Sequence, residues 1–122
     1  PNFVKAAVCM SGTYDMSRWM DGAHTFDYHV SSPLHFIPQL PDGPQLHQLR
    51  QRGAILATGE GRAEAPQESW QVANTLGKQG IPNRVDVWGP GWHHDWPTWR
   101  TMLPLYLDEL TGGPRAPVPY RR

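Results

Sequence analysis

The feature that most constrains the fold of this chain is an alternation of strand-like and helix-like patterns between residues 54 and 88. Residues 54–58 (AILAT) form an apolar run, residues 67–79 place Val72 and Leu76 on one helical face, and residues 84–88 (RVDVW) resume an extended pattern. Segments of these lengths are typical of a right-handed βαβ crossover, which joins two parallel strands. The sequence therefore predicts an α/β protein with a parallel sheet.

Further elements extend this pattern on both sides. Residues 4–10 (VKAAVCM) are typical of a buried strand, and residues 98–110 carry apolar side chains at helical spacing. Residues 16–43 show no clear periodicity, so we expect a long loop with one short helix around residues 15–20, followed by a helix at residues 45–52. About three strands are few for such a sheet, which indicates the C-terminal part of a larger one.

Composition and charge exclude several classes of protein. The chain has 122 residues, with eleven basic and eleven acidic side chains and no formal net charge, so we expect no nucleic-acid partner. No apolar run approaches the ~20 residues of a membrane helix, so we expect a soluble, cytoplasmic protein without a membrane partner. Residues 1–111 are expected to belong to one domain, and residues 112–122, rich in Pro, Gly and Arg, to form a disordered tail.

Polar residues follow each predicted strand, at residues 11–15, 59–64 and 91–96. In parallel sheets, reactive groups gather in loops beyond the carboxyl ends of the strands. A carboxylate after one strand and a histidine after the next is the chain order of an α/β-hydrolase triad. The nucleophilic serine should precede both in a G-x-S-x-G turn, and no such motif occurs in the sequence. Since the chain also begins without Met, we expect it to be processed, engineered or cut from a longer protein.

Four segments carry a resemblance to a known family: CMSGTYD (9–15), YHVSSPLHFIPQL (28–40), LATGEGRAEAP (56–66) and GIPNRVDVWGPGWHHDWPTWRTMLPLYL (80–107). On these segments the chain resembles the C-terminal half of the esterase D-like esterases, α/β-hydrolases related to the mycobacterial mycolyltransferases. The resemblance implies a partial α/β-hydrolase fold and a serine esterase that hydrolyses or transfers acyl esters. It also implies that the serine nucleophile lies on an N-terminal segment absent from this sequence.

The resemblance assigns roles to individual residues. His94, in His-Asp-Trp, matches the catalytic histidine of the family, and His93 is its neighbour. Glu64 is the expected triad acid, because related members have a Glu at a similar spacing, and Glu60 is the alternative. The Ser-Gly segment at Ser11 is a support beside the site, since its turn lacks the glycine pattern of a nucleophile.

Aromatic residues surround the predicted histidine in sequence. We expect Trp92, Trp96 and Trp99 to pack first in the core and second as a wall of the pocket, where excluded water would strengthen the hydrogen bonds of the site. Asp95 is expected to cap the last helix, because Pro97 lies in its first turn.

No metal or cofactor is expected. The sequence holds six histidines but no H-E-x-x-H, C-x-x-C or i, i+4 histidine pair. His24 and His29 lie five residues apart in the irregular segment, and His35 and His47 stand alone. We interpret these four as polar loop residues.

Two functional hypotheses follow. In the first, the chain supplies the acid and histidine of a serine esterase, with a small-molecule ester as substrate, and its partner is the N-terminal half of the same domain or a second copy. On this hypothesis the chain alone is inactive, because a histidine without a serine has nothing to activate. In the second, the chain is a non-catalytic α/β module that associates through an exposed sheet edge.

Overall fold

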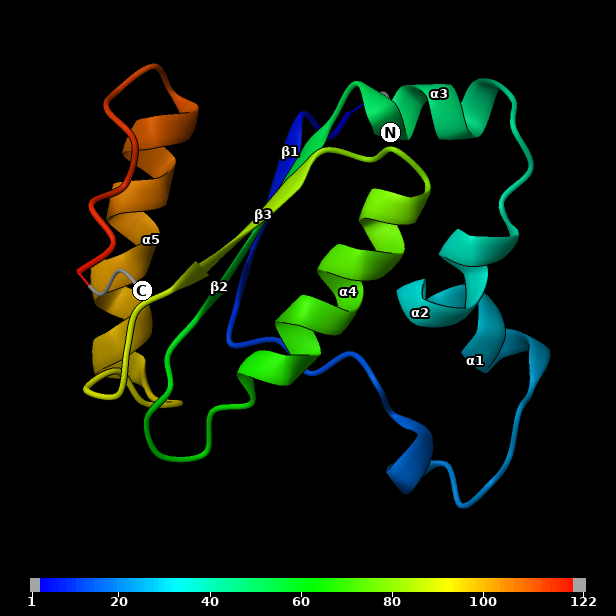
Figure 1. Ribbon diagram of the computed structural model, residues 1–122, viewed down its shortest axis with the longest axis horizontal. Coiled ribbons are helices and arrows are strands. Elements are labelled where there is room, and N and C mark those ends of the chain that lie inside the picture. Colours follow the sequence, from blue (N-terminus) through cyan, green and yellow to red (C-terminus); the bar gives the residue numbers. More distant parts are fainter. Residues whose placement is uncertain (1–2, 120–122) are drawn as a thin grey trace.

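The computed structural model describes residues 3–119, and its centre is a parallel sheet of three strands (Figure 1). The strands lie in the order β1-β2-β3, and the register aligns Cys9 with Leu56 and Leu56 with Val85. The α/β class and the parallel sheet are therefore confirmed. The strand bounds are Ala6–Met10 for β1, Gly53–Thr58 for β2 and Asn83–Val87 for β3.

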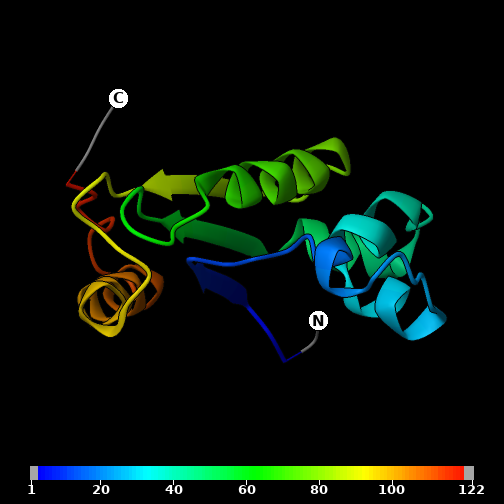
Figure 2. The ribbon, with the colours of Figure 1, turned by 90° about the horizontal axis from the view of Figure 1, so that it is seen from below.

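Two long helices cover opposite faces of the sheet, α4 (Pro66–Lys78) and α5 (Trp96–Leu110) (Figure 2). Alternate residues of β2 serve the two faces: Ile55 and Ala57 are buried in the cluster that includes α5, and Leu56 in the cluster that includes α4. Both clusters are apolar layers on a sheet whose central strand is buried on both sides. This places the loops after the three strands at one edge of the sheet.

The segment between β1 and β2 contains more helix than its sequence predicted. One short helix was expected around residues 15–20, and the structure has a 3-10 helix there, Ser17–Trp19. The helix expected at residues 45–52 is α3 (Pro44–Arg50). The unexpected helices are α1 (Phe26–Ser31) and α2 (Pro33–Phe36), with a second 3-10 turn at Ile37–Gln39. Helices this short are set by their caps and prolines, not by an apolar repeat, so a search for periodicity misses them.

The last helix begins two residues earlier than expected. Asp95 is its N-cap, and the Asp95 carboxylate accepts a hydrogen bond of 3.1 Å from the Thr98 amide, which confirms the predicted cap. The same hydrogen bond holds the pKa of Asp95 below its ordinary value. The cap matters for the site, because it fixes the helix directly after His93 and His94.

Residues 112–119 were expected to be part of a disordered tail, but in the structure they pack against α5. Ala116 is 1% exposed and Val118 6% exposed, and both belong to the cluster under α5. The Ala116 amide donates a hydrogen bond of 2.9 Å to Glu109, which ties the tail to its own helix. The two apolar side chains, although they lie among prolines and glycines, anchor this segment to the core under α5. Residues 120–122 lie outside the described part of the chain.

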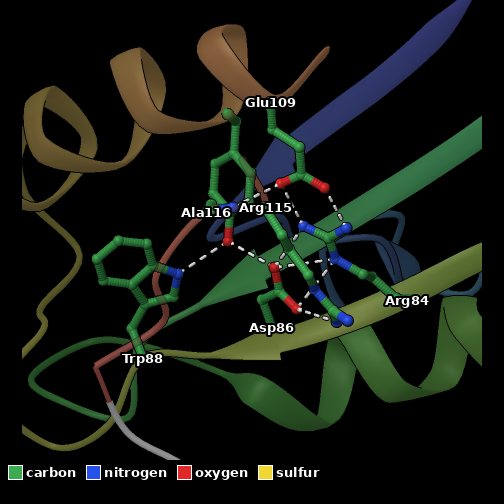
Figure 3. A network of polar contacts seen from close by, with 7 residues as sticks. Arg84, Asp86, Trp88, Glu109, Arg115 and Ala116 are labelled. Atoms are coloured by element: carbon green, nitrogen blue, oxygen red, sulfur yellow. Dashed lines mark hydrogen bonds and ion pairs between the residues drawn. The ribbon is translucent and has the colours of Figure 1, made fainter. Parts of the chain in front are cut away.

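A polar network lies beneath α5 and joins β3 to that helix (Figure 3). Asp86, 2% exposed, accepts hydrogen bonds from the Arg84 Nε atom at 3.1–3.2 Å and from the Tyr106 hydroxyl at 2.9 Å. Arg84 also holds Glu109 through both of its terminal nitrogens, and Trp88 donates to the Tyr106 hydroxyl at 2.9 Å. The buried carboxylate is therefore paired with a permanent cation.

Candidate functional site

Three loops meet beyond the carboxyl ends of the strands, at residues 11–15 after β1, 59–64 after β2 and 89–95 after β3 (Figure 1). Backbone hydrogen bonds join the second loop to the third. The Glu60 amide donates to Gly89 at 2.8 Å, the Gly61 amide to Trp92 at 2.9 Å, and the His94 amide to Arg62 at 3.0 Å. The two loops that carry the predicted acid and histidine are thus one connected unit.

Close packing of these loops depends on two glycines. A Cβ atom on Gly59 would lie 2.0 Å from the carbonyl oxygen of Trp92, and one on Gly61 would lie 2.1 Å from the His93 ring. Neither distance is possible between non-bonded atoms. The backbones can approach this closely only because both positions lack a side chain.

Glu64 is the acidic residue that the structure brings to the histidine. Its side chain is 1% exposed, and its Oε1 atom accepts hydrogen bonds from the Ser11 hydroxyl at 2.6 Å and from the Gly59 amide at 3.1 Å. Its Oε2 atom lies 3.3 Å from the Nδ1 atom of His94. Ala63 has a positive φ of 62°, a left-handed turn directly before the glutamate. Glu64, and not Glu60, therefore makes the contact.

The two adjacent histidines have different surroundings. The His94 side chain is 39% exposed, and its ring makes an edge contact with Trp99 at 4.9 Å between centroids. The Nδ1 atom of His93 instead accepts a hydrogen bond of 2.7 Å from the Arg62 amide. His93 thus supports the loop, and His94 is the histidine that faces both the carboxylate and solvent.

Ser11 lies behind the carboxylate. It has a φ of 55°, which is uncommon for a residue other than glycine, and its amide bonds to the carbonyl of Ala57 at 2.8 Å. Its hydroxyl donates to Glu64 and accepts a hydrogen bond of 3.0 Å from the Nε1 atom of Trp99. The Ser11 hydroxyl is therefore hydrogen-bonded to the Glu64 carboxylate and to the Trp99 indole, and to no atom of His94 among the described residues.

Of the three tryptophans expected in the core and the pocket wall, Trp96 is the one that the structure leaves exposed. Trp92 packs against Trp88 at 4.9 Å in the cluster under α5, so it lies in the core, and Trp96 is 67% exposed. Trp99 makes the contact with His94, and Trp96 touches Trp99 from outside at 5.3 Å. Trp99 lies one turn after the Asp95 cap and also packs against the core cluster under α5.

The arrangement forms a chain of polar contacts from Trp99 through Ser11 and Glu64 to His94. A buried carboxylate beside Nδ1 favours the tautomer with the proton on that nitrogen and leaves Nε2 as the basic atom. Within residues 3–119, the His94 ring makes no other hydrogen bond. Nε2 is therefore the nitrogen of this half-exposed ring that is left to accept a proton.

Possible metal ligands gather elsewhere. Among residues 3–119, three side chains of metal-binding type come together at His24, His29 and His35, and not at the Glu64–His94 contact. His47, which the sequence left isolated, lies 3.4 Å from Asp42. No helix in the described part of the chain is long and apolar enough to cross a membrane.

No protein-family model matches the chain, and neither the curated proteins nor the solved structures include a match.

Proposed function

We propose that this chain supplies the acid and base of a serine hydrolase that acts on carboxylic esters, by hydrolysis or acyl transfer. The observation that carries the proposal is the contact of 3.3 Å between Glu64 Oε2 and His94 Nδ1. The acid is almost fully buried and the imidazole is exposed, as a base that must reach a substrate requires.

The proposed mechanism gives each side chain a separate task. Glu64 holds the His94 ring with its proton on Nδ1 and stabilises the imidazolium that forms during the reaction. The Nε2 atom of His94 takes the proton of a serine hydroxyl while the serine oxygen attacks the ester carbonyl. That proton then passes to the departing alcohol, and an acyl-serine remains until water or a second alcohol removes the acyl group. Trp99 covers one side of the ring and reduces its contact with water.

The proposed nucleophile comes from outside these 122 residues. The sequence has no G-x-S-x-G turn, and the Ser11 hydroxyl bonds to the acid of the pair and not to its histidine. In the described residues, β1 pairs with β2 alone, so its outer edge is open to a further strand. A strand from the N-terminal half of the same domain, or from a second copy, would bring its carboxyl end to the loops of this site.

A fluorophosphonate probe tests this proposal, because it labels only an activated serine. We expect labelling of the natural protein that contains this chain, a loss of at least about 1,000-fold in esterase activity on His94→Ala, and a similar loss on Glu64→Gln. His47→Ala is the control, because His47 is exposed and contacts Asp42 outside the site, and it should retain labelling. Residues 1–122 alone should remain unlabelled. Labelling of that chain, or labelling that survives His94→Ala, would contradict the proposal.

The non-catalytic alternative rests on the open edge of β1. A module that pairs through this edge would form dimers, which sedimentation would detect as a species of twice the chain mass. A monodisperse monomer would count against it. The buried glutamate beside an exposed histidine favours the hydrolase, because edge pairing needs no such pair.

A further inference from the structure

Three histidines converge at the opposite side of α4 from the Glu64–His94 contact. His24 directly precedes α1, His29 lies within α1, and His35 lies within α2; both ribbon views place these two helices away from the loop at residues 89–95 (Figures 1 and 2). One ring nitrogen of each histidine lies within 4.8 Å of the others. The ring centroids are 4.8 Å apart for His24 and His35, and 5.8 Å apart for His24 and His29.

Local sequence signals produce this convergence. The Thr25 hydroxyl accepts a hydrogen bond of 3.1 Å from the Tyr28 amide and begins α1, which places His24 immediately outside the first turn. Pro33 then begins α2 after Ser32, so the chain changes direction between His29 and His35. Their rings face each other at 6.3 Å with an angle of 10° between the planes. A spacing of five and then six residues gives no helical pair, so the sequence alone conceals the cluster.

A second observation points to a missing ligand at the same place. The Nδ1 atom of His35 and the hydroxyl of Tyr28 are both buried, and neither has a hydrogen-bond partner among the described residues. The Tyr28 ring touches both His24 and His35, at 5.7 and 4.8 Å. A buried polar atom without a partner is unfavourable, and native structures seldom leave two together. A bound ion with its water would supply partners for such atoms.

We propose that His24, His29 and His35 bind a divalent transition-metal ion, with Zn²⁺ as the preferred ion. Imidazole nitrogens suit zinc and its neighbours, whereas magnesium and calcium require oxygen ligands, which this cluster does not include. Zinc–nitrogen bonds of about 2.0–2.1 Å place the nitrogens of a tetrahedral site about 3.4 Å apart. The three ring nitrogens already lie within 4.8 Å of one another, so small side-chain rotations would bring them to the separation that zinc requires. Three protein ligands leave the fourth position to water.

The ion would tie the segment before α1 to the α1–α2 pair. His24 is exposed and lies outside any helix, whereas His29 and His35 are half-buried on helices that pack together. Coordination would therefore fix the loop that leads from the 3-10 helix at Ser17–Trp19 into α1. This role is independent of the ester chemistry proposed above.

Titration of the metal-free chain with Zn²⁺ alone, followed by calorimetry, tests the inference. We expect one ion per chain, and Co²⁺ in its place should give the visible absorption of a four-coordinate site. His24→Asn should weaken binding by more than about 100-fold, beyond the 10–100-fold typical of residues that only support a ligand. His47→Asn is the matched control, since His47 is exposed and contacts Asp42 outside the cluster.

The choice of His24 keeps the result interpretable, because an exposed residue outside the helices can be replaced without loss of the fold. His35→Asn should weaken binding to a similar extent, with circular dichroism as the check on helix content. The inference is overturned if the chain shows no saturable binding up to about 1 mM Zn²⁺, or if His24→Asn binds as tightly as the unmodified chain.

Discussion

The networks around two buried carboxylates of residues 3–119, Asp86 and Glu64, end in different ways. Asp86 is surrounded by Arg84 and Tyr106, and Arg84 is held in turn by Glu109, so the first network is closed by a permanent cation (Figure 3). The network of Glu64 is held from behind by Ser11 but ends at an exposed imidazole. The comparison separates two uses of a buried acid: the closed network stabilises the fold, whereas the open one can bind and release a proton.

Removal of Asp86 should have the largest effect on stability. Asp86→Ala leaves the Arg84 guanidinium and the Tyr106 hydroxyl without their shared acceptor beneath α5. We expect a loss of about 3–5 kcal/mol in the free energy of unfolding, measured by urea denaturation. An unchanged slope of that free energy against urea would show that the variant still unfolds as one unit. A loss below about 1 kcal/mol would show that the closed network does not stabilise the fold.

The closed network should also make stability depend on acid pH. Arg84 lowers the pKa of Glu109 from 4.5 to about 2, mainly through the hydrogen bonds between them. Because the folded state favours the ionised form, this stabilisation is fully present above pH 4.5 and is lost as the pH falls through about 2. It amounts to at most about 3 kcal/mol. Glu109→Gln should flatten the dependence of the unfolding free energy on pH between about 4.5 and 2. A variant that keeps the full dependence would show that Glu109 is not its source.

Removal of the Glu64 carboxylate should lower the free energy of unfolding less than removal of Asp86. Glu64→Ala leaves the Ser11 hydroxyl and the Gly59 amide without an acceptor, so we expect a loss of about 1–3 kcal/mol by thermal or urea unfolding. Glu64→Gln keeps an acceptor oxygen and should lose less stability than Glu64→Ala. Equal losses for the two variants would indicate that the negative charge, and not the hydrogen bonds, holds the loop.

The smallest effect on stability is expected at His94. Its side chain is exposed and its single hydrogen bond is long, so His94→Ala should change the free energy of unfolding by no more than about 0.5 kcal/mol. The comparison between the networks therefore predicts a variant that is fully folded and unable to react. A destabilisation like that of Asp86→Ala would show that both networks serve the fold.

The main elements of the sheet were predictable because their patterns are local. The strand at residues 84–88 and the helix at residues 67–79 were placed within one residue of β3 and α4, since apolar runs and helical spacing report burial directly. Asp95 was identified as a cap from the proline that follows it. Between β1 and β2, the helix at residues 45–52 was predicted from two leucines on one face, and the structure has α3 there. The helices α1 and α2 were not predictable in this way, because they last only one or two turns.

Side-chain directions at the site were harder to predict than positions along the chain. Glu64 and Glu60 follow the same strand, and the later one, which comes directly after a left-handed residue at Ala63, lies beside His94. Trp92 likewise packs in the core, although His94, two residues later, faces the Glu64 carboxylate. The buried tail was missed because Ala116 and Val118 are too few to form a pattern.

The absence of side chains at Gly59 and Gly61 also limits how this site could be transferred to another protein. A scaffold that received only the glutamate and the histidine would lack the clearance that lets the Trp92 carbonyl and the His93 ring lie against those glycines. A design that moves the site to another protein would have to include both loops together, with the backbone hydrogen bonds between them intact. The smallest segment that could carry the site is thus the pair of hydrogen-bonded loops, and not the two residues alone.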